Sequence, residues 1–174
     1  KPEYTYEIVI DPKMSFGTGH HQTTSMMLSY ILENNFQNKK VLDMGCGTGI
    51  LAILAAKKGA KHILAVDYDN ICVDSVKENS ELNGITNIES QLGSKEVIVG
   101  KKFDTILANI NRNILLDQMS TYADLLDSKG ELYISGFYEE EDLPILKKCC
   151  EELSFTFVSH KVLDKWCAAK FIKK

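Results

Sequence analysis

The chain contains 174 residues, 44% of them hydrophobic and 25% charged, with a formal net charge of -4 at pH 7. This length and composition are typical of one ordinary globular domain with a sizeable core. The negative net charge disfavours nucleic acid as a direct partner. No apolar run approaches the roughly twenty residues that span a bilayer, and five cysteines at irregular spacing do not form a disulfide framework. We therefore expect a cytoplasmic protein that does not bind membranes.

The first segment with a clear pattern is residues 4–10, where aromatic and aliphatic residues alternate with others at the period of a strand. We expect residues 1–10 to form this strand or the remnant of a linker, and one domain to extend over residues 11–174. A loop rich in glycine and hydroxyl groups then leads into an apolar helical pattern. Thr23 or Thr24 is the expected N-cap of that helix.

Strands and helices alternate through the rest of the chain. Apolar runs bounded by turn residues predict strands at residues 41–44, 62–66, 87–92, 103–108, 131–136, 155–163 and 166–172. Helical spacing predicts helices at residues 50–58 and 70–83 and along two further core faces, one from Leu115 to Leu126 and one from Leu143 to Leu153. Only Asp164 and Lys165 separate the last two strands, and two residues can join only antiparallel neighbours. The predicted fold is therefore α/β, a doubly wound and mostly parallel seven-stranded sheet with a C-terminal antiparallel hairpin.

Three alternate glycines, Gly45, Gly47 and Gly49, stand between the strand at residues 41–44 and the helix that follows it. Glycine permits backbone conformations that other residues avoid, and it lets a ligand approach the main chain closely. About twenty residues later the next strand ends in Asp67, where nucleotide-binding α/β domains place a carboxylate that accepts hydrogen bonds from ribose hydroxyls. Together the two features predict a site for a cofactor that contains a nucleoside.

The glycines alone do not identify this cofactor, since Gly47-x-Gly49-x-x-Ala52 also satisfies the relaxed dinucleotide fingerprint of NAD-binding proteins. A second candidate for chemistry is Asn109, which follows the strand at residues 103–108. An asparagine at the end of a strand is as often a turn residue that makes local hydrogen bonds. From the residues alone, both interpretations of Asn109 stay open.

Motifs along the chain resemble those of known methyltransferases. The pattern Asp43-x-Gly45-x-Gly47-x-Gly49, the acid closing the second strand and the terminal hairpin resemble the class I methyltransferase fold, which is Rossmann-like and binds S-adenosylmethionine. More specifically, residues 16–24 (FGTGHHQTT), 43–53 (DMGCGTGILAI), 108–110 (ANI) and 165–167 (KWC) resemble the PrmA family, whose members methylate ribosomal protein eleven of the large subunit. The resemblance runs from about Asp11 to the C-terminus, and residues 16–24 are its most specific part.

The resemblance implies particular site residues. In the family, the second threonine of the loop, the first glycine of the turn, the acid closing the second strand and the asparagine closing the fourth contact the cofactor. Here these residues are Thr24, Gly45, Asp67 and Asn109. Together with Gly47 of the glycine turn they form the expected S-adenosylmethionine site. Asn109 is also the expected catalytic residue, orienting the incoming amine opposite the sulfonium, and no ligand spacing predicts a metal site.

The function that the resemblance implies is methyl transfer from S-adenosylmethionine to lysine or N-terminal amines of a large-subunit ribosomal protein. Family members carry an N-terminal domain that grips this protein, and the sequence has no room for it, so we expect the catalytic part alone. Three alternatives stay open: a methyltransferase of the same fold with a small-molecule or other protein substrate, an NAD-dependent oxidoreductase, and a nucleotide-sensing binding module. A proton relay through His20 or His21 of the loop also stays open.

Overall fold

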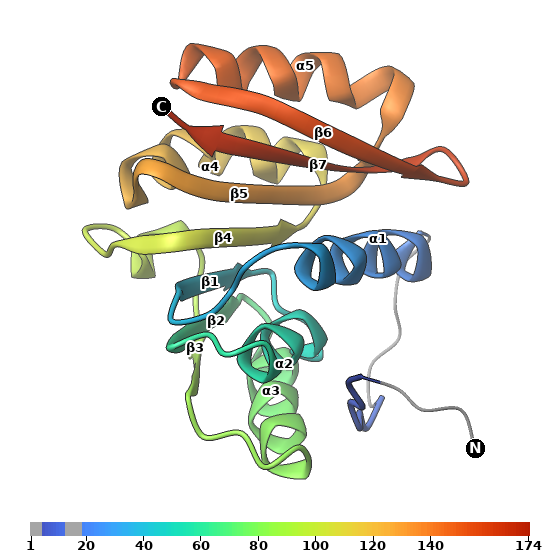
Figure 1. Ribbon diagram of the computed structural model, residues 1–174, viewed down its shortest axis with the longest axis vertical. Coiled ribbons are helices and arrows are strands. Elements are labelled where there is room, and N and C mark those ends of the chain that lie inside the picture. The colour runs from blue at the N-terminus through green and yellow to red at the C-terminus, as the bar shows by residue number, and fades with distance from the viewer. Residues whose placement is uncertain (1–4, 13–18) are drawn as a thin grey trace.

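The computed structural model describes residues 5–12 and 19–174, and Figure 1 shows their arrangement. The strands are β1 (Lys40–Met44), β2 (His62–Asp67), β3 (Ile88–Leu92), β4 (Phe103–Asn109), β5 (Leu126–Tyr138), β6 (Phe155–Leu163) and β7 (Trp166–Lys173). The helices are α1 (His20–Glu33), α2 (Ile50–Lys57), α3 (Asn70–Leu82), α4 (Arg112–Leu125) and α5 (Glu139–Glu152), with a 3-10 turn at Lys95–Val97. The strands and helices predicted after residue 40 are all present, with ends shifted by a few residues.

The strands form one sheet in the order β3-β2-β1-β4-β5-β7-β6, which runs from bottom to top in Figure 1. Strands β1 to β5 pair in parallel, whereas β7 is antiparallel to both β5 and β6. Between β6 and β7, Asp164 and Lys165 have φ angles of 50° and 73°. A two-residue hairpin turn of type I′ requires this left-handed conformation at both positions. The predicted seven-stranded sheet with a terminal antiparallel hairpin is confirmed.

Helices cover both faces of the sheet because the strands alternate their side chains between two apolar layers. In β1, Val41 packs with residues of α1 and α2, whereas Leu42 and Met44 pack in the layer that α4 and α5 cover. Parallel strands buried on both faces appear in the sequence as continuous apolar runs. The carboxyl ends of β1, β2 and β4 meet at one edge of the sheet, where open α/β sheets bind their ligands.

The strand predicted at residues 4–10 is wrong over its described part, which has no regular secondary structure. The alternation in burial is nevertheless present, since Tyr6 and Ile8 pack against the apolar layer under α1 and α2. The main chain of this segment forms its hydrogen bonds with side chains rather than with a neighbouring strand. The side chain of Asn83 accepts a hydrogen bond from the amide of Val9 (2.8 Å) and donates one to its carbonyl (2.7 Å). Periodicity in the sequence does not distinguish this arrangement from a β ladder.

Helix α1 begins earlier than predicted. Its N-cap is Gly19, with a φ of 81°, so the prediction that Thr23 or Thr24 caps the helix is wrong. Both threonines lie inside the first turns, where the hydroxyl of Thr23 donates to the carbonyl of Gly19 at 3.1 Å. A Cβ on Gly19 would approach the indole ring of Trp166 to 2.0 Å. The helix therefore starts at a glycine packed closely against this tryptophan, without a side-chain cap.

Helix α4 passes directly into β5. The sequence places Leu126 on the core face of the helix, but the helix ends at Leu125 and Leu126 is the first residue of β5. Leu126 is buried and pairs with Phe103 of β4, after which the register shifts. A buried leucine satisfies the helical pattern whether it belongs to the helix or to the strand, so periodicity did not locate this boundary.

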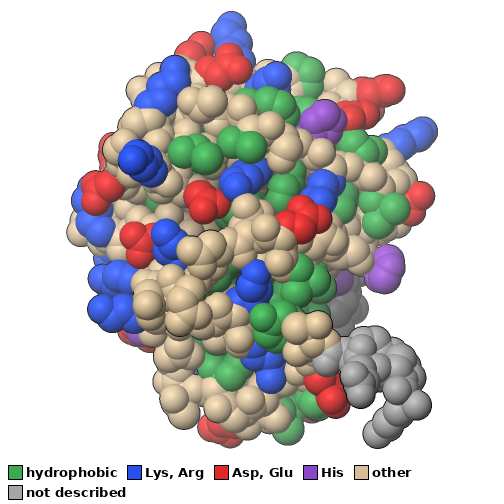
Figure 2. All heavy atoms as spheres, viewed as in Figure 1, with side chains coloured by type: hydrophobic (Ala, Val, Ile, Leu, Met, Phe, Trp, Pro, Cys, Tyr) green, Lys and Arg blue, Asp and Glu red, His purple; other side chains and the backbone are tan. Residues whose placement is uncertain are grey.

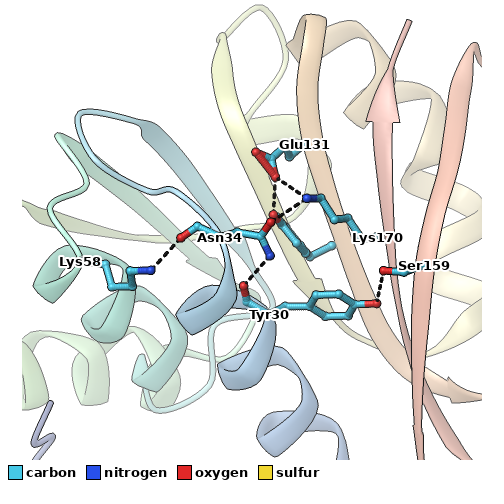
Figure 3. Close-up of polar contacts among 7 residues, drawn as sticks. Tyr30, Asn34, Lys58, Glu131, Ser159 and Lys170 are labelled. Atoms are coloured by element: carbon cyan, nitrogen blue, oxygen red, sulfur yellow. Dashed lines mark hydrogen bonds and ion pairs between the residues drawn. The ribbon is translucent and has the colours of Figure 1, made fainter. Parts of the chain in front are cut away.

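A polar network fixes the C-terminal end of α1 (Figure 3). The ammonium group of Lys58 donates hydrogen bonds to the main-chain carbonyls of Ile31 (3.1 Å), Leu32 (3.0 Å) and Asn34 (2.7 Å). Figure 3 draws the last of these. The side-chain oxygen of Asn34 in turn accepts a hydrogen bond from Lys170 of β7 at 2.7 Å. The last carbonyls of a helix have no partners within it, and a cation there also complements the helix dipole. Lys58 therefore ties α1 to the end of α2.

The surface carries charges of both signs. On the face shown in Figure 2, lysine and arginine side chains are interspersed with aspartate and glutamate. Within residues 5–12 and 19–174, no helix combines the length and apolar character needed to cross a bilayer.

Candidate functional site

The turn after β1 brings residues 45–49 against the end of β2. The amides of Gly45 and Cys46 both donate to the carbonyl of Val66, at 2.8 and 3.1 Å. Gly45 and Gly47 have φ angles of 73° and 56°, which residues with a Cβ seldom adopt. A Cβ on Gly47 would meet no described atom within 4 Å. The turn therefore presents bare backbone to open space, as the close approach of a ligand requires.

Asp67, the last residue of β2, contacts this turn directly. Its side chain is largely buried, with 7% of the residue exposed. Oδ2 accepts a hydrogen bond from the amide of Gly47 at 3.1 Å, and Oδ1 accepts one from the amide of Asp69 at 3.0 Å. Each carboxylate oxygen has two lone pairs, so capacity remains for the hydroxyl groups of a ligand. The glycine turn and the acid predicted from the sequence thus lie side by side.

A cavity of about 250 Å³ opens beside this pair. Gly45 lines it from the turn after β1 and Asp67 from β2, and Ile110 and Gln118 line it from the end of β4 and from α4. Tyr68, which is 81% exposed, contributes an aromatic ring. The cavity lies at the carboxyl ends of parallel strands and combines apolar walls with a few polar groups, as small-molecule sites do.

Several residues of this cavity are not indicated by the sequence motifs, among them Tyr68, Ser94 and Gln118. The hydroxyl of Ser94 accepts a hydrogen bond from the side-chain amide of Gln118 at 3.0 Å, and Gln118 accepts one from the hydroxyl of Tyr122. Gln118 is only 3% exposed. The sequence offers two signals for these residues. Gln118 is a polar residue beside the apolar stripe of α4, and Tyr68 is an aromatic residue directly after Asp67. Both become informative only when the order of the strands is known.

Asn109 lies next to the glycine turn. It ends β4 and pairs with Ser135 of β5. Its carbonyl oxygen lies 3.8 Å from the position of a Cβ on Gly45. The local turn role belongs to Asn111 instead, whose side chain caps α4 by accepting from the amide of Ile114 at 3.0 Å. The structure therefore brings Gly45, Gly47, Asp67 and Asn109 together at one edge of the sheet.

Thr24 is not joined to those four residues by any contact within the described part of the chain. It is half-buried in α1, and its Oγ1 lies 3.5 Å from Nε2 of His20. Burial, and then the neighbouring His21, lower the pKa of His20, which favours the neutral imidazole at pH 7. Residues 16–18, the first part of the specific loop motif, lie outside the described residues. Roles for Thr24, His20 and His21 in the site stay predictions.

Asp43 is a buried carboxyl group beneath the turn. It is 1% exposed, and neither carboxyl oxygen has a hydrogen-bond partner of good geometry among the described residues. Burial raises the pKa of Asp43 to about 7; the nearby amide of Ala52 opposes the rise, and the charge of Asp67 adds to it. An unpaired buried carboxyl group is costly and is usually satisfied by water, an ion or a ligand.

A second cavity, of about 390 Å³, lies on the β5 side of the end of β4. Within it, Arg112 pairs with Oδ1 of Asp142 at 3.0 Å, and Oδ2 of Asp142 accepts from the amide of Tyr138 at 2.8 Å. The rings of Tyr138 and Trp166 stack with their centroids 4.3 Å apart, and the exposed Glu141 adds a carboxylate. Two cavities therefore flank the end of β4, one toward β1 and β2 and the other toward β5.

Comparison with known proteins agrees with this geometry. Residues 1–174 match the family model for ribosomal protein L11 methyltransferase (PrmA). The chain is 48% identical over 174 residues to the ribosomal protein L11 methyltransferase of Phocaeicola vulgatus, covering 99% of this chain and 62% of that protein. It is 48% identical over 171 residues to that of Porphyromonas gingivalis, covering 98% of this chain and 59% of that protein. The chain thus spans about three fifths of the length of these relatives.

Solved structures give the same picture. A crystal structure of ribosomal protein L11 methylase from Lactobacillus delbrueckii subsp. bulgaricus superposes with a TM-score of 0.84 at 35% identity, covering 90% of this chain and 81% of that one. Magnesium protoporphyrin IX methyltransferase from Synechocystis, solved with SAM bound, superposes with a TM-score of 0.73 at 19% identity, over 90% of this chain and 80% of that one, and shares the fold. The chain belongs to the ribosomal protein L11 methyltransferase (PrmA) family.

Proposed function

We propose that the chain is the catalytic part of an enzyme that transfers methyl groups from S-adenosylmethionine to lysine or N-terminal amines of ribosomal protein L11. The observation that carries the proposal is the contact between Asp67 and Gly47 at a cavity of about 250 Å³, in a chain of this family. In the whole protein, an N-terminal domain holds the ribosomal protein, and the two meet in the cytoplasm. The relatives are longer than this chain, which leaves room for such a domain.

The described residues fit S-adenosylmethionine in three respects. The carboxylate of Asp67 has hydrogen-bonding capacity left for ribose hydroxyls. Open space beside Gly47 lets a ligand lie against the backbone. The carboxyl group of Asp43 beneath the turn has no hydrogen-bond partner of good geometry among the described residues, and a cationic group bound at the turn would favour its charged form. The remaining residues that we assign to the cofactor are Thr24, Gly45 and Asn109.

S-adenosylmethionine supplies a methyl group bonded to a positively charged sulfur. The lone pair of the acceptor amine forms the new C–N bond as the C–S bond breaks, the bonding electrons stay on sulfur, and a proton leaves the amine for solvent. In-line displacement of this kind depends on alignment and close approach rather than on a strong base. We assign Asn109 the role of accepting a hydrogen bond from the amine, through its side-chain or main-chain oxygen, and so orienting it.

The cavity on the β5 side is where we propose that the acceptor amine enters. A lysine ammonium is attracted to aromatic faces and to a carboxylate, and this cavity offers Tyr138 and Glu141. An amine with an ordinary pKa near 10.4 must lose its proton before it can react, and removal from water favours the neutral form. The carboxylate and the rings attract the ammonium but favour its charged form, so removal of water as the substrate covers the cavity has to supply the deprotonation.

The other functions left open by the sequence are less well supported. The fold with the order β5-β7-β6 and an antiparallel β7 superposes on that of a ribosomal protein L11 methylase with a TM-score of 0.84, and it gives an NAD-dependent oxidoreductase no support. A binding module without catalysis has no need of the second cavity, which Asn111 and Gly136 line beside the end of β4. A methyltransferase that acts on a small molecule or on another protein is the alternative that an acceptor assay must separate.

The test is incubation of the chain with labelled S-adenosylmethionine and purified ribosomal protein L11. We expect label on lysine or N-terminal amines, mapped by mass spectrometry, and a high KM for L11. The matched control is L11 whose amines have been acetylated, which should take up no label. If S-adenosylmethionine binds but L11 acquires no label at any concentration, the proposed acceptor is wrong.

A further inference from the structure

Ile110, the residue after Asn109, is enclosed by two glycines from different parts of the sheet. A Cβ on Gly45, in the turn after β1, would lie 2.4 Å from Cγ2 of Ile110. A Cβ on Gly136, in β5, would lie 2.6 Å from the carbonyl oxygen of Ile110, 2.8 Å from its carbonyl carbon and 3.1 Å from its nitrogen. Packed interiors leave no room for such overlaps. The side chain of Ile110 thus requires glycine at position 45, and its backbone requires glycine at position 136.

The backbone of β5 is shaped for this contact. Gly136 has a φ of 101°, and the register between β5 and β7 shifts between Ser135 and Phe137, which marks a β-bulge. Directly before the bulge, the carbonyl of Ser135 accepts a hydrogen bond from the amide of Ile110 at 3.1 Å. The hydroxyl of Ser135 donates to the carbonyl of Cys167 in β7 at 2.7 Å. The amide of Ile110 is therefore hydrogen-bonded to Ser135, and its main chain packs against Gly136.

Ile110 also lies between the two cavities described above. Ile110 and Gly45 line the cavity beside Asp67, and Gly136 lines the cavity on the β5 side. The contact between Ile110 and Gly136 therefore separates the proposed site of the methyl donor from that of the amine. A displacement of Ile110 would move Asn109, the adjoining residue in the chain, relative to both.

We propose that Ile110 is a positioning residue, and that the clamp formed by Gly45 and Gly136 sets where Asn109 stands between methyl donor and acceptor amine. This inference rests on the proposed function. Gly45 couples the clamp to the cofactor turn through the side chain of Ile110, whereas Gly136 acts on its main chain. Shortening the Ile110 side chain should therefore relieve the effect of a substitution at Gly45 but not the effect of one at Gly136.

The first test is Gly136→Ala in the full chain, with Gly100→Ala as the matched control. Gly100 has a φ of 80°, and a Cβ there would meet no described atom within 4 Å, so its substitution reports backbone strain alone. We expect Gly136→Ala to lower kcat at saturating cofactor by roughly 10- to 100-fold, and to weaken S-adenosylmethionine binding by a clearly smaller factor, since Asn109 is one of several residues assigned to the cofactor. Full kcat in a folded Gly136→Ala protein, or equal losses of kcat and cofactor affinity, would overturn the proposal.

The second test uses the side chain of Ile110, and its first arm is a binding measurement that needs no turnover. Gly45→Ala should weaken S-adenosylmethionine binding roughly tenfold or more, and adding Ile110→Ala should restore at least about threefold, since the overlap with Cγ2 disappears and Cβ of Ile110 lies 3.8 Å away. Adding Ile110→Ala to Gly136→Ala should restore no activity, because that overlap is with the main chain. Absence of rescue at Gly45, or rescue at both positions, would overturn the clamp. Failure of the unaltered chain to bind cofactor would instead overturn the proposed function.

Discussion

Oδ2 of Asp67 accepts a hydrogen bond from the main-chain amide of Gly47 over 3.1 Å, across twenty positions of sequence. The contact arises because β1 and β2 are parallel neighbours in register, with Met44 opposite Val66, so the residues that follow leave the sheet together. The hydrogen bond holds the glycine turn in its conformation and also orients the carboxylate of Asp67. This contact is the basis of the proposed cofactor site.

Replacing Asp67 with asparagine tests that contact. Asparagine has one side-chain oxygen for the two amides that Asp67 now accepts from, so one of them loses its partner. We expect S-adenosylmethionine affinity, measured by calorimetry, to fall roughly 10- to 100-fold, the equivalent of one charged hydrogen bond of about 1.5–3 kcal/mol. Asp69→Asn is the matched control, because asparagine caps α3 as well as aspartate does. Equal losses in the two variants would contradict the role given to Asp67.

Asn109→Ala tests the proposed orientation of the amine. We expect the rate of methyl transfer at saturating S-adenosylmethionine to fall roughly 10- to 100-fold, because an acceptor amine that is no longer aligned reacts slowly. Single-turnover kinetics with labelled cofactor measures this rate. The exposed Asn35 provides the control Asn35→Ala, which should keep the full rate. An Asn109→Ala protein that binds cofactor normally and transfers methyl groups at the original rate would refute the assignment.

The buried Asp43 should make stability depend on pH. Its pKa rises from 3.8 to about 7 on folding, mainly because of burial, so between these values the folded protein keeps a proton that the unfolded chain has lost. The free energy of unfolding therefore decreases as pH rises through this window, by up to on the order of 4 kcal/mol. Asp43→Asn carries no charge and should flatten the decrease, as measured by urea denaturation at about pH 5 and about pH 8. The same pH dependence in both proteins would show that Asp43 does not cause it.

Lys58→Met should loosen the C-terminal end of α1. The substitution keeps most of the aliphatic stem but removes three hydrogen bonds to main-chain carbonyls. We expect the free energy of unfolding to fall by about 1–3 kcal/mol, measured by urea denaturation. Lys57→Met is the control, since Lys57 belongs to the same helix end and makes no polar side-chain contact with the described residues. A matching loss in the control would mean that charge near the helix end, rather than these bonds, provides the stability.

Much of the fold could be predicted because its signals are local. Buried parallel strands appear as apolar runs, and the two residues between β6 and β7 allow only an antiparallel pairing. The N-terminal segment could not be predicted in the same way. Its alternation in burial matches a strand, but its hydrogen bonds go to the side chain of Asn83 at the end of α3. Which partner supplies such bonds depends on tertiary structure that periodicity does not contain.

The candidate site shows the same limit. Gly47 and Asp67 could be paired from the sequence because they belong to one β-α-β unit with a characteristic spacing. Ser94 and Gln118 could not, because they reach the cavity only when the order β3-β2-β1-β4 brings their elements beside it. The enclosure of Ile110 likewise joins the turn after β1 to a bulge in β5, and no local pattern links those two segments.

The central claim, that the cavity beside Asp67 and Gly47 holds S-adenosylmethionine, is tested most directly by calorimetric titration of the chain with S-adenosylmethionine and, separately, with NAD. The account predicts one saturable site for S-adenosylmethionine that Asp67→Ala weakens, and no comparable binding of NAD. If S-adenosylmethionine does not bind, or if NAD binds more tightly, the claim is contradicted.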